Sequence, residues 1–312
     1  MSVPGAPQPA LGIPMPLAEA TALAHAVTQR MLADHGIRAL FVKGPVAALQ
    51  GLRPPKTSLD ADILCDPAAM DGARILFERH GWVRYYGDRS DALAIGAHAQ
   101  AYVRDGWPCS VDLHAHFPGF LAPPEVVFTY LWGRRSVIDV AHQPITVPDP
   151  ADHLVLLGVH GLRGLPLDAP LPSAQLRSGW EGLGDDGRAA AVATARHTGA
   201  LEPLRELLVE LGADPGPVQE EYAPEYARWH GLRARPGDAA TVWAGRWQAA
   251  SWRQRPALAW RAVWDVSVDR DRTPQEWAQA GPRARMAGRV RRARKGIRQG
   301  WAHVRPRPTP PP

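Results

Sequence analysis

The stretch IRALFVKGPVAALQGLRPPKTSLDADILC, residues 37–65, contains two short apolar runs with a glycine turn and a polar loop between them. The first run, Ile37 to Val42, ends at Gly44-Pro45, which predicts a buried strand followed by a turn into a short helix over residues 45–51. The second run, Asp60 to Cys65, predicts another strand. This succession of strand, helix and strand is typical of a mixed α/β unit.

The same alternation continues on both sides of this stretch. Apolar residues at helical spacing predict a first helix from Leu17 to about His35, and an amphipathic helix over Pro67 to His80. Three more strands are predicted, the last two joined at Asp105-Gly106, which is a strong hairpin turn signal. These strands are expected over residues 82–86, 98–104 and 109–117. We therefore expect an α/β (α+β) core with a mixed sheet over residues 17–149.

From Pro150 onward the pattern changes to helices. Helical spacing is found over residues 152–162 and 189–211, and segments rich in Trp and Ala lie between residues 239 and 264. Clusters of Gly and Pro, one of them at residues 164–187, are expected to separate these helices. The sequence therefore predicts a mostly α-helical region over residues 150–281.

The two ends of the chain differ from the rest in composition. Residues 1–16 contain five prolines and little periodicity, which predicts a flexible leader. Residues 282–312 form a basic, Pro-rich tail, in which Pro282 to Arg307 carries ten Lys and Arg residues and no Asp or Glu. A local basic segment suits phosphate-rich partners such as nucleic acid. A solvated tail that keeps the protein soluble is the alternative.

The composition excludes several classes of protein. A chain of 312 residues with 45% hydrophobic content can build a substantial core. No apolar stretch is long enough for a transmembrane helix, and the first residues lack the features of a secretory signal, so we expect a soluble cytoplasmic protein. The two cysteines, Cys65 and Cys109, lie in predicted strands. They are expected to be buried free thiols, which excludes a disulfide framework and a thiolate zinc site.

Acidic residues within the predicted strands point to a metal site. Asp60 and Asp62 project from the same face of their strand, because side chains two apart on a strand share a face. Two carboxylates held so close repel each other unless a cation or a proton lies between them. Asp112 lies inside an apolar strand, where an unpaired charge is costly. Upstream, Lys43 and Gly44 are positioned to meet phosphate oxygens.

These motifs together resemble the uncharacterised nucleotidyltransferases of the polymerase-β-like superfamily. The matching residues are Leu40 to Gly44 (LFVKG), Asp60 to Leu64 (DADIL) and Val111 to His114 (VDLH). Pro150 to Leu154 (PADHL), with His160, is similar to the family's helix that opens the second half. The resemblance is clear over about residues 17–162 and weak over the helical remainder.

The resemblance implies a metal-dependent transfer of a nucleoside monophosphate from a nucleoside triphosphate, in the first instance ATP, to an unidentified acceptor hydroxyl. Asp60 and Asp62 would bind the Mg²⁺ or Mn²⁺ that carries the triphosphate, and Asp112 would hold a second ion and help to deprotonate the acceptor. The residues expected to contact the nucleotide are Lys43, Gly44, Lys56 and His114. Lys56 stands where the family usually has an arginine, and Ala115 where it has a bulky aromatic residue.

Two other functions fit parts of the sequence. Asp112, His114 and His116 are spaced two apart on a predicted strand, and such a ladder could bind zinc in a metal-dependent hydrolase. A non-catalytic nucleic-acid-binding protein on a nucleotidyltransferase fold is the second alternative. His153 and His160 share one face of a predicted helix, where they could contact substrate or fill core and capping positions.

Overall fold

The computed structural model describes residues 15–85, 98–163, 165, 167, 169–233 and 251–257, and in the tail 281–284, 286–288, 290, 291 and 294. Its main helices are α1 (Leu17–Asp34), α2 (Gly44–Leu49), α3 (Met70–Arg79), α5 (Pro124–Gly133), α6 (Pro150–Leu162), α7 (Ser173–Gly182), α8 (Gly184–His197), α9 (Leu201–Glu210) and α10 (Ala223–Arg233). Its strands are β1 (Ala39–Val42), β2 (Asp60–Cys65), β3 (Val83–Tyr85), β4 (Ala99–Val103), β5 (Ser110–His114), β6 (Ser136–Val140) and β7 (Gln143–Val147). The predicted leader up to residue 14, and the Trp-rich segments apart from residues 251–257, lie outside the described residues.

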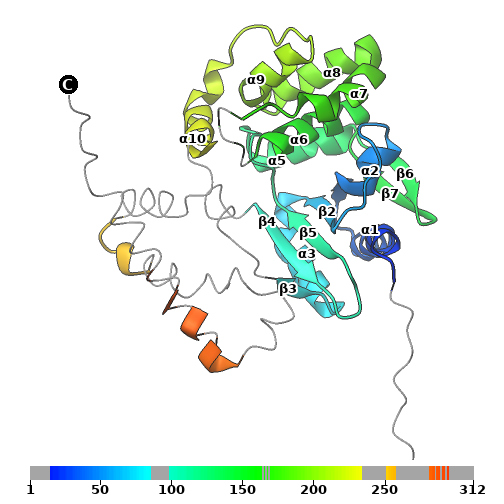
Figure 1. Ribbon diagram of the computed structural model, residues 1–312, viewed down its shortest axis with the longest axis vertical. Helices are drawn as coiled ribbons and strands as arrows, with labels where there is room; N and C mark the ends of the chain where they lie inside the picture. Colours follow the sequence, from blue (N-terminus) through cyan, green and yellow to red (C-terminus); the bar gives the residue numbers. More distant parts are fainter. Residues whose placement is uncertain are drawn as a thin grey trace, which may run out of the picture.

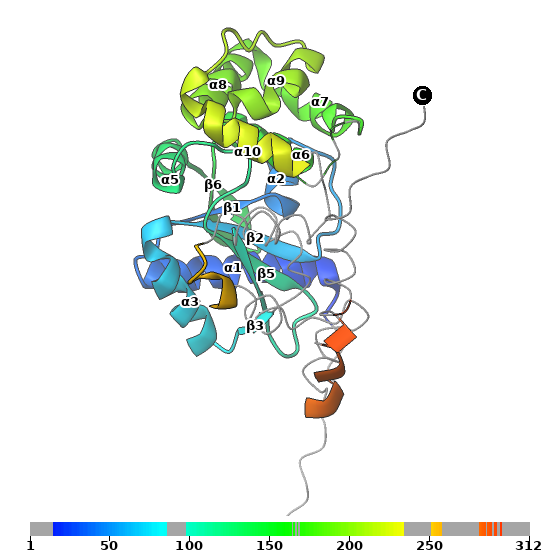
Figure 2. The same ribbon diagram turned by 90° about the vertical axis from the view of Figure 1, so that its left-hand side faces the viewer.

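The central sheet has five strands in the order β1-β2-β5-β4-β3. β2 and β5 are parallel, whereas the pairs β1–β2, β4–β5 and β3–β4 are antiparallel. The sheet is therefore mixed, and the helices from α6 to α10 follow it in the chain, which confirms the predicted fold class (Figures 1 and 2). The turn between β4 and β5 contains Gly106 at φ 74°, as the predicted hairpin requires.

The two faces of the sheet pack against different helices. Phe41 and Ile63 belong to one buried cluster together with apolar residues of α1 and α3. Leu40 and Leu64, which alternate with them along the same strands, belong to a second cluster that includes residues of α5, α6, α7, α8 and α9. Figure 2 shows helices α6 to α10 gathered above the sheet, and α3 lower in the view. The helical half of the chain therefore covers one face of the sheet.

Helix α6 lies at the centre of the helical group and packs against α7, α8 and α9. Its Asp152 is fully buried and accepts hydrogen bonds from Arg134 Nε at 3.0 Å and from the Thr194 hydroxyl at 2.6 Å. Because Arg134 follows α5 and Thr194 lies on α8, one buried carboxylate connects three helices. Buried charges of this kind need such partners to offset the loss of hydration.

Two predictions about the helical region are wrong. The helix expected over residues 189–211 is two helices, α8 and α9, separated at Gly199. Gly199 has φ +70°, and a Cβ there would lie 2.8 Å from the backbone nitrogen of Ala122, so only glycine fits this close approach. The cluster at residues 164–187 was expected to be a separator, yet it contains α7. Gly179 of α7 packs directly on the chain at Leu52, where a Cβ would lie 2.4 Å from the carbonyl oxygen.

Other elements were not predicted at all, namely α5, α10 and the two-stranded hairpin of β6 and β7. The hairpin lies against α1 and β1. Cys65 and Cys109 are free and buried, which confirms the prediction for both thiols. None of the described helices is both long enough and apolar enough to cross a lipid bilayer.

Candidate active site

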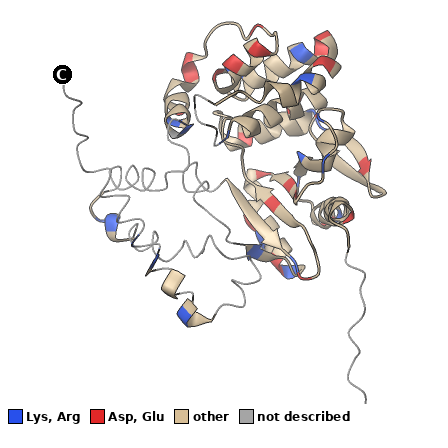
Figure 3. Cartoon of the chain, in the orientation of Figure 1, with Lys and Arg blue, Asp and Glu red and all other residues tan. Residues whose placement is uncertain are grey.

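The register of the two parallel strands brings acidic residues together. Asp62 of β2 lies opposite Asp112 of β5, and Asp60 lies opposite Ser110. Since side chains alternate along a strand, Asp60, Asp62 and Asp112 share the face of the sheet that the helical half covers. Figure 3 shows the acidic segments of these neighbouring strands close together at the middle of the molecule.

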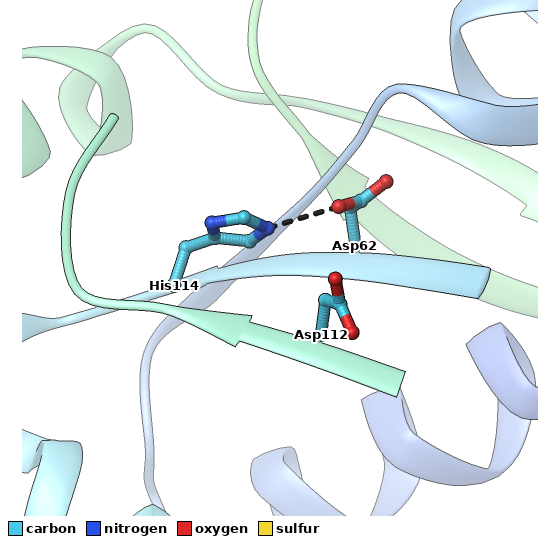
Figure 4. Close-up of side chains that lie close together, drawn as sticks. All are labelled: Asp62, Asp112 and His114. Atoms are coloured by element: carbon cyan, nitrogen blue, oxygen red, sulfur yellow. Dashed lines mark hydrogen bonds and ion pairs between the residues drawn. The ribbon is translucent and has the colours of Figure 1, made fainter. Parts of the chain in front are cut away.

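Asp62, Asp112 and His114 form a group of possible metal ligands within the described part of the chain. One ligand atom from each lies within 4.8 Å of the others, and Figure 4 shows them pointing toward one another from β2 and β5. Asp60 is outside this group in the part of the chain that the structure describes. Its carboxylate accepts a hydrogen bond from the Ser58 hydroxyl at 3.1 Å. Asp60 is nevertheless close enough for its charge to act on Asp112.

Asp62 is a buried carboxylate with two strong partners. The Lys43 ammonium forms an ion pair with its Oδ1 atom, and His114 Nε2 lies 2.9 Å from the same oxygen. Burial by itself raises the pKa of Asp62, but Lys43 and His114 outweigh burial and hold that pKa well below the usual range. Asp62 is therefore an anion at every pH at which the protein is expected to work.

Asp112 has the opposite electrostatic character. Burial, followed by the negative charges of Asp62 and Asp60, raises the pKa of Asp112 to about 7 against the opposing charge of Lys43. Among the described residues, none forms a hydrogen bond or an ion pair with this carboxylate. A cation near Asp112 would relieve the repulsion, and a proton does so when no cation is bound.

His114 is neutral and orients Asp62. Burial lowers the pKa of His114 to about 4, against the opposing effect of its hydrogen bond to Asp62. A neutral imidazole beside an anionic carboxylate donates, so the proton lies on Nε2 and Nδ1 is an acceptor. The ring stacks on Phe117, with 4.3 Å between ring centroids. His114 thus fixes the position of the Asp62 carboxylate, as residues behind metal ligands commonly do.

The Lys43-Gly44 turn lies beside this carboxylate. Val42 at the end of β1 pairs with Asp62, so Lys43 is the first residue after the strand and its side chain reaches Asp62. Gly44 opens α2, a helix of six residues, and its carbonyl oxygen accepts a hydrogen bond from Arg53 Nη2 at 3.1 Å. The lysine, the glycine turn and the carboxylates are therefore assembled in one place.

Lys56, by contrast, is exposed, and no hydrogen bond or ion pair of its side chain is found among the described residues. Arg53 from the same loop lies close enough to the carboxylates for their charges to act on it. Burial lowers the pKa of Arg53, and the charges of Asp62 and Asp60 act to raise it. Sequence reasoning missed Arg53, because nothing in the polar loop around it indicates which basic side chain turns inward.

The histidine ladder of the hydrolase alternative is not assembled. β5 ends at His114, and His116 does not join Asp112 and His114 in a ligand group within the described residues. The His116 ring instead meets the ring of His98 edge-on, at 6.0 Å between centroids. His160 lies near the site, since the charges of Lys43 and Asp62 influence its pKa, which burial lowers to about 3.

The candidate site lies in a part of the chain that matches a known protein family. Residues 19–165 match a protein family described as uncharacterised nucleotidyltransferases. The matched region runs from α1 through α6 and contains every candidate site residue discussed above. No curated protein matches the chain.

Proposed function

Because the segment 19–165 belongs to the uncharacterised nucleotidyltransferase family, we propose that this protein is a metal-dependent nucleotidyltransferase. It would transfer a nucleoside monophosphate from a nucleoside triphosphate, ATP in the first instance, to a hydroxyl group of an acceptor. The observation that carries this proposal is the pairing of Asp62 with Asp112 on adjacent parallel strands.

The residues present fit a divalent metal ion. Two carboxylates converge, and burial, together with the charges of Asp62 and Asp60, raises the pKa of Asp112 to about 7, so a cation would relieve the cost of the Asp112 charge. Mg²⁺ and Mn²⁺ prefer oxygen ligands of this kind. Asp60 and Asp62 would hold the ion that carries the triphosphate, and Asp112 would hold a second ion. When bound, such ions neutralise phosphate charge and stabilise the attacking and leaving oxygens.

The protein's own side chains would then act on the two substrates. The acceptor oxygen attacks the α-phosphorus, a new P–O bond forms, and the bond to the bridging oxygen of the leaving pyrophosphate breaks. The acceptor hydroxyl loses its proton in this step, and the Asp112 carboxylate is the candidate group that takes it up. Lys43 would move its ammonium to the phosphates, and Gly44, Lys56 and His114 are the further candidates for contact with the nucleotide.

Calorimetric titration with ATP, with and without Mg²⁺, tests the proposal. Asp62→Asn and Asp60→Asn should each abolish most of the metal-dependent binding, because a carboxylate ligand is lost. Asp71→Asn is the matched control, since Asp71 is a highly exposed aspartate on α3 that pairs only with its neighbour Arg74 among the described residues. Equal binding by Asp62→Asn and Asp71→Asn would refute the proposed site.

The reaction itself is tested by measuring pyrophosphate release. Each of the four nucleoside triphosphates should be offered with a panel of acceptors that includes small hydroxylated molecules, proteins and RNA ends. Release that depends on both metal and acceptor, and that is lost in Asp112→Asn, is the expected result. A wild-type protein that binds Mg²⁺ and ATP but gives no release with any acceptor would contradict transferase activity.

The basic tail gives a reason to include nucleic acids among the acceptors. Ten Lys and Arg residues lie between residues 282 and 307, and most of them are outside the described residues. Cations on such a segment bind phosphate backbones and release counterions, so the affinity falls steeply as salt is added. Removal of residues 282–312 should weaken RNA binding and flatten its salt dependence. If neither changes, the tail is not a nucleic-acid contact.

A further inference from the structure

We propose that His153 is a positioning residue that holds the backbone of Lys43 in the conformation that aims its ammonium into the active site. The inference rests on the proposed function, because it concerns the lysine that would meet the triphosphate. It comes from a chain of hydrogen bonds that joins the Lys43-Gly44 turn to helix α6.

The backbone of Lys43 adopts a conformation that side chains rarely allow. Its φ is 59° and its ψ is −144°, close to a region that is essentially restricted to glycine. The cause lies in the strand register: Val42 still pairs with Asp62, and the chain must reverse at the next residue to begin α2. A non-glycine residue stays in such a conformation only when its surroundings hold it there.

His153 supplies that support from α6. It is fully buried, and its Nε2 atom accepts a hydrogen bond from the Lys43 backbone N–H at 2.8 Å. An acceptor at Nε2 places the ring proton on Nδ1, which donates to the Gln50 side-chain oxygen at 2.5 Å. The Gln50 amide in turn donates to the carbonyl oxygen of Pro148 at 2.8 Å. Every donor in this series of three hydrogen bonds has an acceptor, so the tautomer and the orientation of the His153 ring are both fixed.

The chain of bonds connects the two halves of the protein. Lys43 follows β1 and Gln50 follows α2, whereas Pro148 precedes α6 and His153 lies in the first turn of that helix. The bond between Lys43 and His153 spans 110 residues of sequence. The sheet therefore brings the carboxylates together, and the first helix of the helical half sets the direction of the lysine.

Two conservative variants separate positioning from simple filling of space. In His153→Gln the side-chain amide can reach the place of Nε2 and still accept from the Lys43 N–H. In His153→Asn the shorter amide reaches only the place of Nδ1 and cannot. Hydrogen exchange at the Lys43 amide, measured by NMR, should show protection in the wild type and in His153→Gln, and loss of protection in His153→Asn. Lack of protection in the wild type, or equal protection in both variants, would overturn the proposal.

Titration of the same proteins with ATP and Mg²⁺ tests the functional consequence. The affinity of His153→Asn should fall by about 10- to 100-fold, which is typical for the loss of a residue that orients a ligand, and His153→Gln should recover most of it. Equal affinities in the two variants would refute a positioning role. If His153→Asn does not fold, Gln50→Leu provides the second test, because it removes only the partner of Nδ1, and its affinity should lie between the wild-type value and complete loss. Wild-type affinity in Gln50→Leu would also overturn the proposal.

The two measurements keep this proposal distinct from the proposed function. A wild-type protein that protects the Lys43 amide through His153 but does not bind ATP would contradict nucleotidyl transfer and leave the backbone support in place. A protein that binds ATP with Mg²⁺ equally well in both His153 variants would contradict the positioning role alone.

Discussion

The Asp112 carboxylate should make the metal-free protein less stable as the pH rises toward neutrality. Burial, reinforced by the charges of Asp62 and Asp60, raises the pKa of Asp112 to about 7 in the folded protein. In the unfolded chain the same group has an ordinary pKa near about 4. The folded state therefore binds the proton more tightly, and stability is lost where only the unfolded chain has released it.

The size of the effect follows from the distance between the two pKa values. Each pH unit between them costs about 1.4 kcal/mol, so the loss between about pH 4 and pH 7 is at most roughly 4 kcal/mol. Asp112 is partly rather than fully buried, and screening by water reduces this to about 2–4 kcal/mol. Asp112→Asn cannot ionise. It should be more stable than the wild type at pH 8 by that amount, and nearly equal to it at pH 4.

Thermal unfolding in the presence of a chelator measures this directly. For a protein of this size the difference at pH 8 corresponds to a shift in Tm of about 3–6 °C in favour of Asp112→Asn. Addition of Mn²⁺ at pH 8 should then stabilise the wild type more than Asp112→Asn, because only the wild type has the Asp112 carboxylate, whose charge the cation neutralises in place of the missing proton. A Tm difference between the two proteins that is the same at pH 4 and pH 8 would show that Asp112 titrates normally, and the electrostatic argument for the metal site would fail.

Three further outcomes are expected from the packing. Gly179→Ala should lower the free energy of unfolding by about 1–3 kcal/mol, because the added methyl group meets the backbone of Leu52. In Gly182→Ala, at the end of the same helix, the methyl group meets nothing, and the free energy of unfolding should change little. Chemical denaturation of the two variants measures the difference. Asp152→Ala should cost about 3 kcal/mol in the same assay, because it removes the carboxylate that connects three helices. Burial raises the pKa of Cys65 to about 12 and also raises that of Cys109, so neither thiol should react with iodoacetamide until the protein is unfolded; rapid labelling of the native protein would contradict their burial.

Local patterns predicted the elements of the core well. The strand from Asp60 to Cys65 has the predicted bounds, because an apolar run of this length between a polar loop and a proline forms few structures other than a buried strand. The shared face of Asp60 and Asp62 follows from strand geometry alone. The Asp105-Gly106 turn likewise predicted the hairpin that precedes Asp112, since few residues adopt a positive φ as readily as glycine.

Such local patterns do not determine which residues of distant strands pair with each other. The pairing of Asp62 with Asp112 depends on the register of two strands that are far apart in the sequence, and a shift by one residue would turn one carboxylate to the opposite face. The bond between Lys43 and His153 also depends on tertiary packing, so the helical spacing of His153 showed only that it could face the core. Gly199 marks the division between α8 and α9, yet the sequence pattern predicts one continuous helix there, because the close approach of Gly199 to Ala122 is a tertiary contact.

Covering one face of the sheet contributes to both stability and chemistry. Leu40 and Leu64 are buried against the helical half on the face that carries the carboxylates, and this burial is the main favourable contribution to folding of the two halves together. Removing water from that face is also the largest cause of the raised pKa of Asp112 and the lowered pKa values of His114 and His153. The helices that stabilise the sheet thereby create an environment in which an aspartate holds its proton near neutral pH and the histidines remain neutral. The electrostatics of the site are thus a consequence of the hydrophobic packing around it.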